Sequence, residues 1–195
     1  CGGIRGSKFK IMKKLATFFV FVGIMLLSTQ AFARRVYVKL YGTDAWSAVT
    51  ADENNVVIVL PENSTDFFEE VLSSLQADDE VWVAAGEYKN SGKLLLDGFS
   101  IYGGFAGTET ALTDRTRSDK DGNEMVEAWE FTNETNFRGA GNTVENASGF
   151  QLVQLNANSV LDGVTLSDNY YTASNYASGG EVKKGAVISN CIIRD

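Results

Sequence analysis

Histidine is absent from this chain of 195 residues, and proline and cysteine are nearly absent. Without histidine, the segment cannot form the Ser-His or Cys-His pairs that activate many hydrolytic nucleophiles. The single proline, Pro61, stands against 19 glycines. Turns must therefore be made by Gly, Asn and Asp, which is more typical of all-β chains than of helical ones. Beyond the N-terminal segment only Cys191 remains, so no intramolecular disulfide is expected there.

Basic residues are also few, and they are unevenly placed. The chain has 17 Lys and Arg against 25 Asp and Glu, a net charge of −8. Residues 1–33 hold five of the basic residues and no acidic one, which leaves 12 basic against 25 acidic residues, a net charge of −13, in the rest. This excess of negative charge argues against nucleic acid and anionic membranes as partners.

Residues 12–33 have the three parts of a secretory signal peptide. A pair of lysines precedes the apolar run 15–27, and an A-x-A end follows, formed by Ala31 and Ala33. The run is too short to span a bilayer core of ~30 Å at ~1.5 Å per residue. Cleavage after Ala33 predicts a mature chain that is secreted or displayed on the cell surface or outer membrane. Residues 1–11 precede Met12 and are interpreted as upstream sequence read through in frame.

Strand patterns dominate the mature chain. Residues 35–40 alternate with period two, residues 54–60 form a continuous β-branched run that predicts a buried strand, and residues 80–88 form a further strand. One helix is predicted over about 65–76, from apolar residues at i, i+3, i+4 and i+7 and from the capping-box spacing of Asp66 and Glu69. Helical periodicity does not return after it.

Three short phrases look like internal repeats. Residues 95–101, LLDGFSI, align with residues 160–166, VLDGVTL, at an offset of 65, and residues 187–193, VISNCII, follow at 27. We interpret 65 as about three turns of ~22 residues in a stack of parallel strands. Each phrase places polar residues and glycine at a bend, where glycine accepts positive φ. The predicted structural corners are Asp97, Gly98, Gly103, Gly104, Asp162, Gly163, Ser189 and Asn190.

The glycine-rich stretch 100–110, SIYGGFAGTET, admits two interpretations. A phosphate cradle would need a helix directly after the glycines, and no helical pattern follows. We therefore expect an architectural role. Gly103 and Gly104 turn the chain, Phe105 packs back near the predicted helix, and Gly107 leads into a loop.

These phrases resemble the right-handed parallel β-helix proteins exported by Bacteroidetes-type bacteria. The resemblance rests on DDEVWVAAGEY at 78–88, on 94–117 with its SIYGGFAGTET phrase, and on VLDGVTLSDN at 160–169. It implies an all-β right-handed parallel β-helix with a short N-terminal capping helix, truncated at its C-terminus. Residues 34–63 would be N-terminal strands, and 64–195 the capping helix and first coils. We expect such a fragment to self-associate through its open end.

Catalytic chemistry finds little support in this segment. The loop 114–124 departs from a calcium-binding loop, because its glycine is misplaced and no closing Glu follows. Asp97 and Asp162, as equivalent corners three coils apart, would be on the order of 14 Å from each other at ~4.8 Å per coil, too far to act as a carboxylate pair. Lys183 and Lys184 lie in a polar turn. We predict no catalytic residue, no metal ligand and no cofactor here.

A loop rich in tyrosine is the candidate ligand site. Tyr170, Tyr171 and Tyr176 stand among small polar residues, and exposed tyrosines can stack on sugar rings. The alternative is that they pack against the side of the coil. We expect an exported glycan-binding or adhesin-like scaffold, with a polysaccharide or a cell-surface glycan as its partner. The alternatives are a polysaccharide lyase or glycoside hydrolase with its active site in further coils, and a purely structural stalk.

Overall fold

The computed structural model describes residues 33–61, 67–90, 94–139, 151–168 and 178–194. Most of the predicted signal peptide lies outside these residues. Strands dominate the described part, and the named strands all pair in parallel, which confirms the all-β expectation. No helix among the described residues has the length and apolar character needed to cross a membrane.

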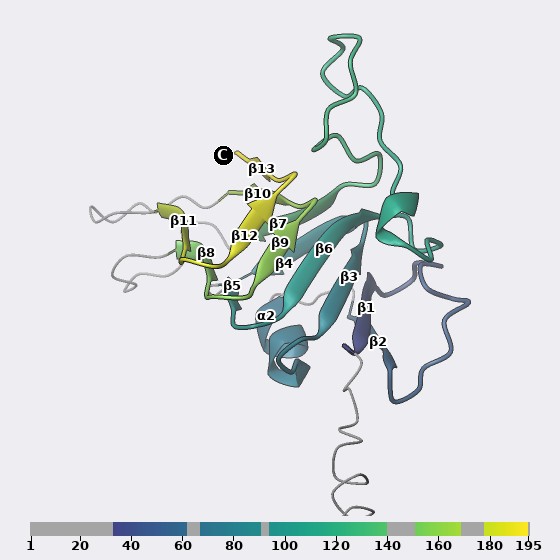
Figure 1. Cartoon of the computed structure of the whole chain (residues 1–195). Helices are drawn as coiled ribbons and strands as arrows, with labels where there is room; N and C mark the ends of the chain where they lie inside the picture. The colour runs from purple at the N-terminus through teal and green to yellow at the C-terminus, as the bar shows by residue number, and fades with distance from the viewer. Residues whose placement is uncertain (1–32, 62–66, 91–93, 140–150, 169–177, 195) are drawn as a thin grey trace, which may run out of the picture. The chain divides into compact units, whose positions relative to one another are not determined.

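The strands form three sheets (Figure 1). Sheet A has the order β12-β9-β6-β3-β1-β2, sheet B the order β13-β10-β7-β4, and sheet C the order β11-β8-β5. The strands of sheet A are β1 (Arg35–Leu40), β2 (Asn55–Leu60), β3 (Glu80–Ala84), β6 (Ser100–Phe105), β9 (Val160–Asp162) and β12 (Val187–Ser189). Those of sheet B are β4 (Gly86–Asn90), β7 (Thr135–Gly139), β10 (Thr165–Ser167) and β13 (Ile192–Ile193). Those of sheet C are β5 (Leu94–Leu96), β8 (Gln151–Leu155) and β11 (Ser178–Val182).

From β3 onward the chain visits the sheets in a fixed order, A, then B, then C. Val81, Ile101, Leu161 and Ile188 are paired in register across sheet A. Successive passes around the three sheets therefore take 20, 60 and 27 residues. The second pass is long because it carries the connection 106–134, which extends away from the sheets (Figure 1).

This register corrects the interpretation of the repeats. Asp97 and Gly98 follow β5 and lead from sheet C to sheet A. Asp162 instead ends β9, and Gly163 follows it and leads from sheet A to sheet B. The offset of 65 therefore joins two different corners and is not a whole number of passes. The phrases match because both bends use a glycine with positive φ, +80° at Gly98 and +71° at Gly163.

The offset of 27 is confirmed. Val187 pairs with Val160, and Ser189 pairs with Asp162. Asn190 then takes the place of Gly163 at the bend, with a φ of +50°. Asparagine is among the few residues other than glycine that enter this region readily.

Alternation along the strands of sheet A separates an inner from an outer face. Val36 and Val38 of β1, like Val81 and Val83 of β3, are fully buried in the main apolar core. Strand β2 was expected to be buried, but most of it is half-buried because it is the edge strand of the sheet. The side chains on the outer face of β1 and β3, Tyr37 and Trp82, belong to a second cluster.

This second cluster is aromatic. Tyr37, Trp46, Trp82 and Phe105 bury their rings together, with the Trp82 and Phe105 rings stacked at 4.6 Å and 14°. Trp46 comes from the connection between β1 and β2, and its ring lies 4.9 Å from that of Tyr37. Phe105 therefore packs outside sheet A, and the expectation that it lies near the helix is wrong.

The predicted helix ends earlier than expected. Helix α2 covers Phe67–Val71, and a 3₁₀ turn, Leu72–Ser74, continues it; a second 3₁₀ turn covers Leu112–Asp114. The α-helix follows β1 and β2, and the described residues contain no helix before β1. Phe67 and Val71 are buried, and the Phe67 ring lies 4.7 Å from that of Phe137 in sheet B.

Candidate functional site

The residues predicted to bind a ligand lie beyond what the structure describes. Tyr170, Tyr171 and Tyr176 fall between residues 168 and 178, and Ala31 lies before residue 33. Ala33 is exposed, two residues before the start of β1. The tyrosine loop and the cleavage site therefore remain predictions.

The stretch SIYGGFAGTET is held by close packing at its glycines. Gly103 and Gly104 lie inside β6, beside a register shift against β3, and are not a corner beyond the strand. A Cβ at Gly103 would lie 2.6 Å from the carbonyl oxygen of Gly163 in the next pass. A Cβ at Gly107, where φ is +97°, would lie 2.3 Å from that of Ala45. Glycine is therefore required at these positions because neighbouring backbone approaches closely.

The turn after β6 is closed by the carboxylate of Glu109. The backbone N–H of Ala106 donates to its Oε1 at 2.7 Å, and those of Gly107 and Thr108 donate to its Oε2 at 2.8 and 2.9 Å. Such a group of converging N–H donors forms an anion-binding nest. Here the nest is occupied by the protein's own side chain, which fixes the shape of the turn.

A hollow of about 240 Å³ lies between this turn, the outer face of sheet A and the β1–β2 connection. We call it the sheet A hollow. It is lined by Arg35, Tyr37, Trp46, Ala48, Val49, Gly107, Thr108, Glu109 and Thr110. At ~30 Å³ per water it has room for about eight waters, and so for one small ring rather than a polymer chain. Tyr37 and Trp46 are nearly buried beneath it, so the surface that a ligand can reach consists of apolar groups of Ala48 and Val49, hydroxyl groups and, among the described lining residues, one cation.

Arg35 is the cation of the sheet A hollow. Its guanidinium lies over the Trp82 ring, 4.1 Å from the ring centre. Its Nε lies 3.3 Å from Oε1 of Glu80, an ion pair without hydrogen-bond geometry, and this buried Nε has no hydrogen-bond partner. The Arg35 side chain is 35% exposed, so the guanidinium is within reach of a ligand.

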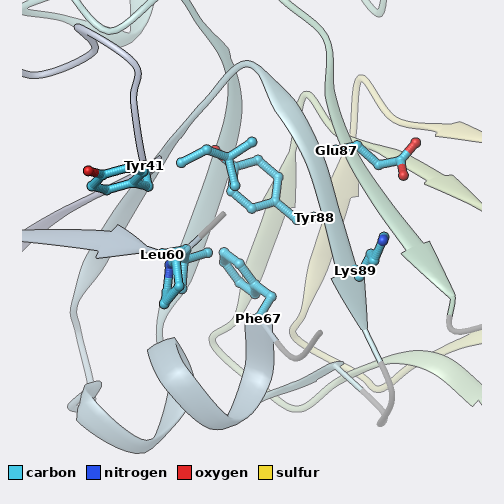
Figure 2. A pocket seen from close by; sticks show the side chains of 8 residues that line it. Tyr41, Leu60, Phe67, Glu87, Tyr88 and Lys89 are labelled. Carbon is cyan, nitrogen blue, oxygen red and sulfur yellow. The ribbon is translucent and has the colours of Figure 1, made fainter. Parts of the chain in front are cut away.

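A second hollow, of about 140 Å³, lies beside helix α2 (Figure 2). Leu60, Phe67 and Tyr88 form its apolar interior, with Glu87 and Lys89 at its edge. The Tyr88 hydroxyl donates to the carbonyl of Ala84 at 2.8 Å, and burial raises the pKa of Tyr88. The interior thus offers no free polar group to a ligand, and its size suits only a small apolar group.

Asp162 was expected to be a corner residue, and its carboxylate also anchors the long connection. Nη1 of Arg115 donates to Oδ1 of Asp162 at 2.7 Å, and both side chains are buried. Oδ2 of Asp162 accepts from Ser189 at 2.5 Å and from Asn190 at 2.6 Å. Three segments distant in sequence are therefore joined at one carboxylate, between sheets A and B. Asp97, by contrast, is exposed and accepts a hydrogen bond from Asn156.

The connection 106–134 also gathers acidic side chains. Carboxylate oxygens of Asp119, Asp121 and Glu130 lie within 4.8 Å of one another, and oxygen ligands of this kind suit Ca²⁺ or Mg²⁺. Each carboxylate already accepts backbone N–H groups of its own loop, as when Glu130 accepts from Lys120 and Glu127. The loop 114–124 was interpreted as solvated. The sequence shows Asp119 and Asp121 two residues apart in this loop, but it does not indicate that the carboxylate of Glu130 lies close to theirs.

Glu127 and Glu130 in this loop have opposite pKa shifts. The N–H of Lys120, and then that of Glu127, hold the pKa of Glu130 below its ordinary value. At Glu127 a hydrogen bond from Asn123 favours the charged form, but the adjacent Glu130, burial and nearby negative charge outweigh it and raise the pKa. Oε2 of Glu127 is buried and has no partner among the described residues. The two carboxyl groups interact directly, so they are too close to flank a glycosidic bond.

Comparison of the chain with known proteins assigns no family and no function to these residues. No family model, no curated protein and no solved structure matches the chain.

Proposed function

We propose that residues 34–195 form coils of a right-handed parallel β-helix that serves as an exported glycan-binding scaffold. The fixed succession of sheets A, B and C supports the coil, because each pass adds one parallel strand to each sheet. Parallel strands joined by a crossover are right-handed in about 98% of cases. The order of the sheets is thus what a three-sided β-helix requires.

We infer that helix α2 caps these coils. It packs against β4, the first strand of sheet B, and against β2. Its buried Phe67 lies between Tyr88 of β4 and Phe137 of β7, at 5.4 and 4.7 Å between ring centres. A cap is needed on this side because β4 is an end strand of sheet B, and the buried Phe67 ring would supply apolar cover there.

The single observation that carries glycan binding is the sheet A hollow. It lies on a parallel sheet and joins apolar surface of the exposed Ala48 and the half-buried Val49 to the guanidinium of Arg35 and the hydroxyl group of the exposed Thr108. Sugars are recognised by this combination of an apolar face and hydrogen-bonding groups. The hollow has the size of one small ring, which suits a terminal or branching sugar.

Binding is favoured over hydrolysis because of the state of Glu109. Hydrolysis by paired carboxylates needs two acids about 5–10 Å apart. Glu109 is the only acid among the described residues that line the hollow, and three backbone N–H groups already hold it. A purely structural stalk would need no such hollow.

Glycan-array binding by the purified chain and two tryptophan variants tests this function. Ala48 is exposed and lines the hollow, so Ala48→Trp fills it without disturbing the core. Ala128→Trp, at an exposed site outside the hollow, is the matched control. We expect binding by the wild type and the control, and none by Ala48→Trp. No binding by any of the three would contradict the function. Loss only in Tyr170→Ala/Tyr171→Ala would instead move the site to the tyrosine loop.

A further inference from the structure

Resting on the proposed glycan binding, we propose that the sheet A hollow selects sugars that carry an anionic group, a carboxylate or a sulfate ester, and that Arg35 binds this group. The proposal follows from the hydrogen-bonding state of the hollow's one cation. The acidic groups near it, Glu80 and Glu109, already accept hydrogen bonds from other parts of the protein.

Arg35 is held in a fixed orientation. It lies on the outer face of β1, two residues before Tyr37, so both side chains face the hollow. The Trp82 ring, 4.1 Å from the guanidinium carbon, supports the guanidinium from one side. A stacked guanidinium is pre-organised, so it loses little conformational entropy when a ligand binds.

The donors of Arg35 are available. Within the described residues its side chain donates no hydrogen bond. Its Nε is buried, so the two terminal nitrogens are the donors that a ligand can reach. Glu80 is 3.3 Å away, but the same Glu80 oxygen accepts from the indole N–H of Trp82 at 2.5 Å. A guanidinium has five N–H donors in a planar fork that matches a carboxylate or sulfate. An anionic ligand would supply the missing acceptors.

Glu109 does not supply them. Both of its carboxylate oxygens accept from the turn's backbone N–H groups, and the ion pair that Arg35 makes in the described chain is with Glu80. The turn that contains Glu109 is therefore held by its own backbone N–H groups, and it does not need the guanidinium of Arg35 as a partner. The exposed Ala48 and the half-buried Val49 provide apolar surface for the ring of the sugar that carries the anionic group.

Matched oligosaccharides test the proposal. The set differs only at the terminal ring, which carries a carboxylate, a sulfate ester or a neutral hydroxymethyl group. Binding is followed by tryptophan fluorescence, because Arg35 contacts Trp82. We expect at least one anionic sugar to bind about tenfold more tightly than its neutral partner, since tenfold corresponds to about 1.4 kcal/mol. The carboxylate and sulfate arms show which anion is preferred.

Arg35→Gln should abolish this preference, so that the anionic sugar and its neutral partner bind with the same affinity. Arg35→Lys keeps the charge and should retain part of the preference. Arg117→Gln is the matched control, because Arg117 also stacks on a ring, 4.4 Å from Phe131, but lies outside the hollow. Near-ultraviolet circular dichroism verifies the fold of each variant.

Equal binding of anionic and neutral sugars, or an equal loss of both in folded Arg35→Gln, would overturn the role of Arg35 and leave glycan binding intact. If Arg35→Gln fails to fold, the other two variants decide the question. The role of Arg35 would be overturned if Arg35→Lys kept the full preference for the anionic sugar while Arg117→Gln lost that preference. Absence of binding for every sugar would instead refute the proposed function.

Discussion

Replacing Asp162 by alanine is expected to destabilise the protein by about 3–5 kcal/mol, the usual cost of removing one partner of a buried ion pair. Asp162 and Arg115 have side chains that are 8% and 7% exposed, and their charged atoms lie 2.7 Å apart. Removal of the carboxylate leaves the guanidinium buried without a counter-charge. Water cannot reach it readily, because the rings of Phe131 and Phe105 lie 4.6 and 5.4 Å away.

Ser189 and Asn190 add little to this cost. Both donate to Asp162, but both are half-buried and can turn toward water when the carboxylate is lost. Arg115→Met should be comparably destabilising, because it leaves the Asp162 carboxylate buried and removes the donors to the carbonyls of Gly103 and Leu112. The ion pair itself, rather than the neighbouring hydroxyl and amide, is expected to dominate.

A double-mutant cycle with Arg115→Met and Asp162→Leu measures this coupling. Urea unfolding followed by circular dichroism gives the free energy of each variant. We expect the double variant to be much more stable than the sum of the single losses predicts, because it buries no unpaired charge. Trypsin should cleave the connection at Arg117 faster in the single variants. Strictly additive losses, or an Asp162→Ala variant within about 0.5 kcal/mol of the wild type, would refute the reasoning.

Two further predictions concern the turn and the acidic loop. Gly107→Ala should cost about 2–4 kcal/mol, from positive φ and the contact with Ala45, whereas Gly42→Ala, with positive φ in open space, should cost about 1 kcal/mol; equal losses in urea unfolding would exclude the contact. Glu127→Gln should raise the melting temperature at pH 7, because the raised pKa of Glu127 means that the fold disfavours its charge. The gain should vanish as the pH falls and wild-type Glu127 becomes protonated; a lower melting temperature at pH 7 would contradict this.

The sequence predicted strands more reliably than their boundaries. Alternation located β1 at residues 35–40 correctly. The run 80–88, predicted as one strand, is two, because the chain passes from sheet A to sheet B at Ala85. Apolar residues continue through this corner, since both sheets face the same core. A period-two pattern therefore cannot reveal where a strand bends into the next sheet.

Neither the sheet A hollow nor the Arg115–Asp162 pair could be predicted from spacing. The hollow joins residues 35–49 to residues 107–110, and the ion pair joins positions 47 residues apart. Both juxtapositions depend on which strands are neighbours. The passes vary from 20 to 60 residues, so no fixed period in the sequence indicates those neighbours.

The two LDG phrases explain how a true local similarity can mislead about register. Each marks a strand end followed by a glycine with positive φ, and such a bend is needed at more than one corner of a pass. A repeated phrase therefore indicates only that the chain bends there. The number of passes between two phrases is given by the pairing of the inward-facing residues of neighbouring strands. Leu161 pairs with both Ile101 and Ile188, and this pairing is insensitive to the connection 106–134 between β6 and β7. Because the sheets tolerate an insertion at that point, the same connection is free to supply the wall of the hollow and the buried Arg115 that fastens it.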